Sequence, residues 1–322
     1  MHFPVSGVDV HPFVPIVVAF FVSFFTSIGG ISGAFLLLPF QMSILKFTAP
    51  SVSPTNMIFN IVAIPSGVYR FIKEERMTWP LAWIIVLGAL PGVLIGAIIR
   101  IRFLPDPRAF KLFVGCVLLY MGYRLIADLF RKSGMGVEQA RALEEKFRQR
   151  VAHTLAARKG RLAAGLPPDA VVRTISWTFN KVSYEFYGER FSFNPSVVFS
   201  LAFVVGIIGG IYGIGGGAII APFIVAFLRL PVYTIAGAAL LGTFVTSVAG
   251  VIVYLVLEYW YSNTGLAIAP DWLLGFFFGI GGFAGIYCGA RAQKYLPQKV
   301  IKSIIATLII TLAARYVIEY FA

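Results

Sequence analysis

Charged residues are scarce in this chain, and the few that are present avoid its long apolar runs. Asp, Glu, Lys and Arg make up 13% of the residues, whereas a soluble domain carries about 25%. Several apolar stretches of about 20 residues contain no charge, which is long enough to cross a bilayer. A soluble globular domain is therefore excluded, and the sequence predicts an integral membrane protein with several spans.

Histidine and cysteine are also scarce, and their positions argue against catalysis and metal binding. The three histidines (His2, His11 and His153) are scattered, so we do not expect an enzyme. Cys116 and Cys288 lie in separate apolar runs without a CxxC motif. We therefore expect no metal site, no cofactor and no disulfide framework. The net charge of +13 is attributed to basic cytoplasmic loops or to a potential that gathers anions, and no nucleic-acid partner is expected.

Acidic side chains are absent from the interior of every predicted span; Asp128, Glu258 and Glu319 lie at span ends. Proton-coupled carriers usually keep an intramembrane carboxylate or histidine. The absence argues against a cation pump and is consistent with anion movement. It leaves open weak or absent coupling, a proton that travels with the substrate, or a coupling group at a span end. No Lys or Arg precedes residue 14, so we expect insertion by an internal segment and no cleavable signal.

A glycine-containing stretch occurs twice, at residues 30–40 and 213–223, and the two copies are 183 residues apart. Each copy is a small-residue break inside an apolar run, followed by a proline. In lipid, such a break is tolerated only where protein or a water-filled cavity satisfies the freed backbone groups. Two breaks at matching positions of two half-chains indicate a transporter substrate site.

The sequence thus predicts an all-α polytopic membrane protein with two repeats of about five helical segments each, in which short helices are broken at glycines. Because each repeat holds an odd number of segments, the repeats are expected to be inverted. Whether the first helix of each repeat crosses the membrane or re-enters is left open. The first repeat covers residues 1–130 and the second covers residues 196–322. We expect helices at residues 14–28, 33–47, 53–72, 79–101, 110–130, 196–212, 217–229, 232–257, 271–292 and 298–320.

The insert at residues 131–195 is polar and carries 12 Lys and Arg residues. Apolar residues four apart predict an amphipathic helix at 137–161, and alternating stretches at 171–179 and 182–193 predict a β-hairpin. The positive-inside rule predicts that this insert lies in the cytoplasm and that both termini lie on the outer side of the cytoplasmic (inner) membrane. Regulation, a dimer contact or binding to an anionic leaflet are the roles considered for it.

One predicted loop conflicts with this orientation, because it would hold basic residues on the outside. Either the orientation is wrong or the loop is an anion-gathering patch at an outer mouth. The basic residues are Arg100, Arg102, Arg108 and Lys111.

A broken helix aims free N–H groups and a partial positive charge at the point where it restarts. Two inverted breaks are therefore expected to form one site for a small anion, with glycines letting the backbone approach it. For each single residue, helix packing is the alternative. Lys46 and Arg229, at symmetry-related helix ends, are candidate anion attractants or interfacial snorkelling residues. The predicted substrate-binding residues are Gly30, Ser32, Gly33, Asn56, Asn60, Gly213, Gly215, Gly216, Gly217, Thr243, Thr246 and Ser247.

The duplicated glycine break with its following Pro-Phe, in a ten-segment chain of this length, resembles the TauE/SafE sulfite exporter family, also called the toluene-sulfonate uptake permease (TSUP) family. The second copy, Gly209-Gly210-Ile211-Tyr212-Gly213-Ile214-Gly215-Gly216-Gly217, is the closer match, and the first departs from the pattern at Ser32. The resemblance covers both repeats but not the insert. It implies transport of sulfite, organosulfonates or related sulfur-containing anions.

We therefore expect a secondary transporter that moves a small sulfur-containing anion, such as sulfite, sulfoacetate or another organosulfonate, by alternating access around the two breaks. Export is the expected direction. The expected partners are this anion and the lipid bilayer, and a homodimer is left open. The alternatives are a passive anion channel, or a membrane receptor or enzyme that acts through the cytoplasmic insert.

Overall fold

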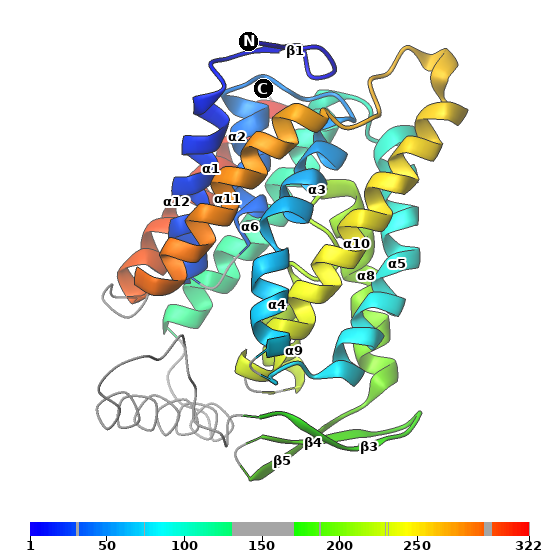
Figure 1. Cartoon of the computed structure of the whole chain (residues 1–322). Coiled ribbons are helices and arrows are strands. Elements are labelled where there is room, and N and C mark those ends of the chain that lie inside the picture. The colour runs from blue at the N-terminus through cyan, green and yellow to red at the C-terminus, as the bar shows by residue number, and fades with distance from the viewer. Residues whose placement is uncertain are drawn as a thin grey trace.

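The protein is a bundle of helices with a small sheet at one end, opposite the two chain termini (Figure 1). In the part of the chain that the structure describes, six helices are long and apolar enough to cross a membrane. The prediction of a polytopic helical membrane protein is confirmed. The computed structural model describes residues 1–29, 32–73, 75–130, 171–186, 188–228, 230, 232–292 and 298–321.

The helices follow the order that the repeats predict. The first repeat contains α1 (Phe13–Gly29), α2 (Ala34–Ser43), α3 (Val52–Ala63), α4 (Pro65–Lys73), α5 (Trp79–Arg102) and α6 (Pro107–Phe130). The second contains α8 (Pro195–Tyr212), α9 (Ile220–Leu228), α10 (Val232–Trp260), α11 (Trp272–Ala292) and α12 (Gln298–Phe321). Short elements also occur near the N-terminus and after α10: β1 (His2–Phe3), β2 (Val8–Asp9) and the 3₁₀ turn η1 (Ser262–Thr264).

Helix packing follows a pseudo-twofold relation between the repeats. Helix α5 packs along α8, and its counterpart α11 packs along α1. In the same way α5 contacts α10 while α11 contacts α3, and α6 packs against its own counterpart, α12. The first helix of repeat one starts at the end of the bundle that holds the termini, whereas α8 starts at the end that holds the sheet (Figure 1). The two repeats therefore run in opposite directions through the bundle.

Glycines let these symmetry-related helix pairs touch through their backbones. A Cβ added at Gly92 of α5 would lie 2.3 Å from the carbonyl oxygen of Phe203 in α8. A Cβ added at Gly285 of α11 would likewise lie 2.3 Å from the carbonyl oxygen of Phe20 in α1. The small-residue stripes thus bring helices together, as expected for packing in lipid.

Three departures from the predicted helices concern the two breaks and the helix beside them. The helix predicted at 53–72 is two helices, because Pro65 lacks an N–H and its ring clashes with the carbonyl four residues earlier, so the chain breaks at Ile64. The helix predicted at 33–47 ends at Ser43, where the amides of Ile44 and Phe47 bond back to Phe40 and Gln41. The helix predicted at 217–229 starts only at Ile220, so the second glycine break is longer than expected.

The insert contributes a three-stranded antiparallel sheet, formed by β3 (Arg173–Trp177), β4 (Val182–Phe186) and β5 (Glu189–Phe193). The predicted hairpin is present between β3 and β4. However, the stretch predicted as one strand at 182–193 forms a second hairpin, in which Phe186 pairs with Glu189 and Gly188 has a φ of +76°. Glycine adopts this left-handed conformation without strain, which permits the tight turn. The predicted amphipathic helix at 137–161 lies outside the described residues.

Candidate functional site

The second glycine break lies at the centre of the bundle, where α8 ends. Gly213 and Gly215 have φ values of +82° and +73°, in the left-handed region that other residues enter at a cost. Gly213 also lies directly against α3, because an added Cβ would be 2.2 Å from the carbonyl oxygen of Ser53. Both the conformation and the contact therefore require glycine at this position.

The carbonyl groups at the end of α8 are satisfied by donors from its own break and from two other helices. The amides of Gly213 and Ile214 bond back to the Gly209 carbonyl at 2.8 and 3.1 Å. Such carbonyls would otherwise be orphans in a membrane interior. Four further carbonyls accept hydrogen bonds from side chains of α3 and α10: Gly210 from Tyr254 (2.9 Å), Ile211 from Ser53 (2.8 Å), Gly213 from Asn56 (3.2 Å) and Ile214 from Asn60 (3.1 Å).

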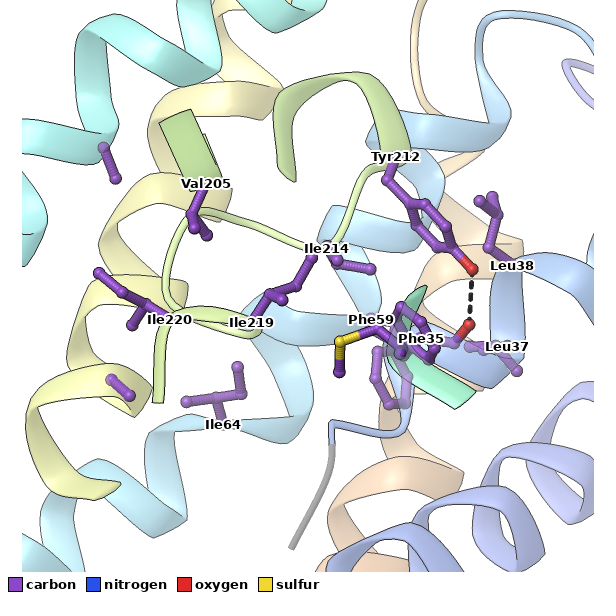
Figure 2. Packing of buried hydrophobic residues seen from close by; sticks show 14 of the residues in the cluster. Phe35, Leu37, Leu38, Phe59, Ile64, Val205, Tyr212, Ile214, Ile219 and Ile220 are labelled. Atoms are coloured by element: carbon purple, nitrogen blue, oxygen red, sulfur yellow. Dashed lines mark hydrogen bonds between the residues drawn. The ribbon is translucent and has the colours of Figure 1, made fainter. Parts of the chain in front are cut away.

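Asn56 links the two breaks. Its Nδ2 donates to the carbonyl of Ala34, the first residue of α2, at 3.0 Å, as well as to Gly213 of the second break. Nearby, the hydroxyl of Tyr212 donates to the carbonyl of Phe35 at 2.8 Å, and the two rings stack with centroids 5.4 Å apart (Figure 2). The start of α2 and the end of α8 therefore meet at one point between the repeats.

Thr243 and Thr246 hold the chain where it approaches α9. The hydroxyl of Thr246 accepts a hydrogen bond from the Gly216 amide at 2.8 Å and donates to the Gly242 carbonyl at 2.6 Å. Thr243 donates to the Ala239 carbonyl of its own helix at 2.8 Å. Gly217 packs against this surface, since an added Cβ would lie 2.1 Å from the Ala239 carbonyl oxygen.

Asn60 and Ser247 form the part of the site with spare hydrogen-bonding capacity. Asn60 Nδ2 donates to Ser247 Oγ at 3.3 Å, and a Cβ at Gly215 would lie 2.8 Å from that hydroxyl. Asn60 Oδ1 is buried and has no hydrogen-bond partner among the described residues. Buried polar atoms are normally paired, so this oxygen is available to bond a donor group.

The first break is described only in part, because Gly30 and Ile31 lie outside the described residues, as does Arg229. Ser32 is half-buried and Gly33 is buried. A Cβ added at Gly33 would lie 2.6 Å from Ser23 Oγ and 3.3 Å from the ring of Phe59. Ser23 Oγ is a second buried polar atom that has no partner in the described part of the chain.

Apart from Ser32, the predicted site residues that the structure describes fall into two groups. Lys46 is exposed in the loop after α2, with a φ of +58°, and takes no part in the contacts above. The other group gathers at the meeting point of the repeats: Gly33, Asn56, Asn60, Gly213, Gly215, Gly216, Gly217, Thr243, Thr246 and Ser247.

Arg100 is not an exposed member of the basic loop that was considered as an outer anion-gathering patch. This side chain is fully buried, donates to the carbonyls of Thr48 and Leu104, and lies 3.6 Å over the ring of Phe110. Lys111 forms an ion pair with Glu319 at 2.9 Å. Arg100 therefore joins the loops after α2 and α5 at the end of the bundle. Its guanidinium is buried because the carbonyls of these loops provide its hydrogen-bond acceptors.

Several residues that shape the site are not among those that the sequence predicted. Tyr212 and Ser53 donate to carbonyls of the other repeat, and Tyr254 of α10 donates to the Gly210 carbonyl of α8 within the second repeat. Gln41 Nε2 donates to Asn56 Oδ1 at 3.2 Å. Their signal in the sequence was a polar group inside an apolar run, which for Tyr212 stands directly before the break.

A cavity of about 610 Å³ lies between α3, α10 and α11, on the other side of α3 from the breaks. Its lining is apolar and includes Ile58, Val62 and Val251. It is therefore no site for a small anion.

These features define a class of protein: a polytopic helical membrane protein whose buried, uncharged polar cluster lies between two oppositely directed repeats. The chain belongs to the sulfite exporter TauE/SafE family, whose model matches residues 15–316. It is similar to "Probable membrane transporter protein YunE" of Bacillus subtilis (strain 168), with 21% identity over 300 residues that cover 91% of this chain and 92% of that protein. No solved structure matches. The chain is thus a membrane transporter of this family.

Proposed function

We propose that the protein moves a small sulfur-containing anion, such as sulfite, sulfoacetate or another organosulfonate, across the cytoplasmic membrane by alternating access around its two glycine breaks, in the direction of export. The observation that carries this proposal is the position of Asn56, which donates to Ala34 at the first break and to Gly213 at the second. A single polar cluster thus contacts both repeats, where transporters of this architecture hold their substrate.

The chemistry of the cluster is suited to an anion. Helices α2 and α9 both restart at the cluster, and a helix start carries a partial positive charge. The neighbouring side chains are neutral amides and hydroxyls, so no carboxylate repels a negative substrate there. The buried charged residues in the described part of the chain lie at the ends of helices or in loops: Arg76, Arg100 and Asp271.

Alternating access would exchange hydrogen bonds within this cluster. In the observed conformation Asn56 and Asn60 donate to carbonyls of the second break. A sulfonate or sulfite oxygen would take these donors over as the repeats move apart on one side. The carbonyls of Gly213 and Ile214 would then accept hydrogen bonds from water in a cavity that is open to one side of the membrane.

Ligand-dependent melting of the purified protein tests this proposal. The panel is sulfite, sulfate, thiosulfate, taurine, isethionate, sulfoacetate, acetate and chloride. A ligand that binds only the folded state stabilises it by about 2.7 kcal/mol at 100 times its Kd. We expect one sulfur anion to raise the melting temperature, and Asn60→Ala and Ser247→Ala to remove that increase.

Thr311→Ala is the matched control. Thr311 is exposed on α12 and bonds to the Thr307 carbonyl of its own helix at 2.9 Å, so this variant should keep the full ligand response. Asn60→Ala leaves a buried carbonyl unpaired, at a cost of about 1–3 kcal/mol, and must still melt cooperatively without ligand. Stabilisation by a cation or a neutral solute alone would refute the anion assignment.

Flux into proteoliposomes then separates a transporter from the passive channel. A transporter that exposes its site to one side at a time should saturate as the anion concentration rises. A flux that increases linearly over the same range would favour the channel.

A further inference from the structure

One face of the three-stranded sheet packs on the end of the helical bundle. In β4, the side chains of Val182, Tyr184 and Phe186 are buried. The Tyr184 hydroxyl shares a 2.8 Å hydrogen bond with Thr234 Oγ1 near the start of α10. Burial raises the pKa of Tyr184, so the hydroxyl stays protonated at physiological pH. The sheet is therefore fixed to the bundle by this face.

Strand pairing places Trp177 on the same face. Trp177 lies directly opposite Val182 in the β3–β4 ladder, after an irregularity between Thr174 and Ser176. Residues directly opposite each other in an antiparallel pair project to the same side of the sheet. Yet Trp177 is 58% exposed, whereas Val182 is 0% exposed. The Trp177 side chain thus lies on the face of the sheet that packs on the bundle. The described residues that cover Val182, however, leave more than half of Trp177 exposed.

The position of Trp177 agrees with a membrane interface. Strand β3 contacts α5, whose first turns carry the exposed Trp79 and Trp83. The remaining two of the five tryptophans, Trp260 and Trp272, are exposed at the opposite end of the bundle, where α10 ends and α11 begins. Tryptophan is enriched at both interfaces of a membrane protein. The two groups mark the two ends of the bilayer span, and Trp177 belongs to the group that contains Trp79.

We infer that the β3–β4 hairpin is a membrane anchor, which places Trp177 and Phe179 in the headgroup region of the leaflet beside the start of α5. Phe179 lies in the turn between the strands and is 94% exposed. An aromatic anchor of this kind lies about 5–10 Å deep, at the boundary of headgroups and acyl chains. In Figure 1 the hairpin reaches the edge of the bundle at its lower end.

The anchor relies on aromatic side chains rather than on charge. In the sheet, Glu185 lies opposite Arg173 on one side and opposite Arg190 on the other. With Lys181 and Glu189, the described strands and turn hold three cationic and two anionic side chains. Anionic lipid is therefore not required, and salt should have little effect on the anchor.

Quenching of tryptophan fluorescence by brominated lipid tests this inference in the full chain. The protein is placed in lipid nanodiscs with Trp79, Trp83, Trp260 and Trp272 changed to Phe, so that Trp177 is the remaining fluorophore. Lipids with bromine near the headgroup end of the acyl chain should quench more than half of the emission, and lipids with bromine at the tail end should quench less. High salt should leave the quenching unchanged.

The matched control moves the tryptophan to the opposite face of the same sheet. Ser192→Trp is made together with Trp177→Phe, because Ser192 is exposed and pairs with Ser183, which alternates with Val182 and Tyr184 along β4. This variant should be quenched by aqueous iodide and not by bromolipid. If Trp177 behaves like the Ser192→Trp control, or if neither quencher reaches it because another part of the chain or a second copy covers it, the membrane anchor is refuted.

Discussion

Gly213 combines a φ of +82° with a close backbone contact, because an added Cβ would lie 2.2 Å from the carbonyl oxygen of Ser53. Alanine in the left-handed conformation costs about 1–2 kcal/mol, and overpacking adds about 1–3 kcal/mol. Gly213→Ala should therefore lower the unliganded melting temperature strongly or prevent folding, as measured by the thermal unfolding of the purified protein.

Gly265 provides the control for this prediction. It has a φ of +68° but no atom within 4 Å of an added Cβ, so Gly265→Ala carries only the conformational cost. Equal losses of stability in the two variants would show that the contact between α8 and α3 contributes nothing.

At the level of single residues, the sequence could identify part of the site but not its pairing. Asn56 and Asn60 stand out because amide side chains are rare in apolar runs, and both prove to lie at the break. Their acceptors, however, are carbonyls of Gly213 and Ile214 in the other repeat, which no local pattern specifies. The burial of Arg100 could not be predicted for the same reason, because the carbonyl of Thr48 that it binds belongs to a distant loop.

Among the helices, α3 and α10 occupy equivalent places in the two repeats but differ in continuity. Helix α3 ends at Ala63 and the chain restarts as α4 at Pro65, whereas α10 continues unbroken from Val232 to Trp260. The residue 183 positions after Pro65 is Val248, which explains the difference, since proline breaks the i to i−4 hydrogen bond. Helix periodicity alone predicted one continuous span, although the proline was visible in the sequence.

This difference predicts opposite results for two substitutions. Val248→Pro should destabilise the protein by about 3 kcal/mol or more, which a thermal melt will detect. Pro65→Ala should leave stability almost unchanged, because it restores a missing helical bond. If the hinge at Ile64 serves the movement between access states, Pro65→Ala will slow saturable flux in proteoliposomes. An unchanged flux would show that this break is only a packing feature.

At the scale of the whole molecule, the arrangement of the helices follows from the repeat in the sequence. Helices related by the repeat make related contacts, such as α5 with α8 and α11 with α1. The sheet could be predicted only in part. Its alternating residues indicated strands, but its attachment to Thr234 through Tyr184 depends on how α10 is placed. The insert is thus joined to the bundle by a buried contact rather than tethered at its ends alone.

The orientation of the molecule gives the last prediction. If the sheet lies in the cytoplasm and both termini lie outside, as we propose, opposite ends of the bundle should react from opposite sides. Single cysteines are introduced at Asn263, exposed in η1, and at Ser192, exposed in β5, after Cys116 and Cys288 are changed to Ser. A maleimide that cannot cross membranes should label Asn263→Cys in intact cells and Ser192→Cys only after permeabilisation. The reverse pattern would invert the orientation and make the sheet an external anchor, whereas labelling of both from one side would contradict oppositely directed repeats.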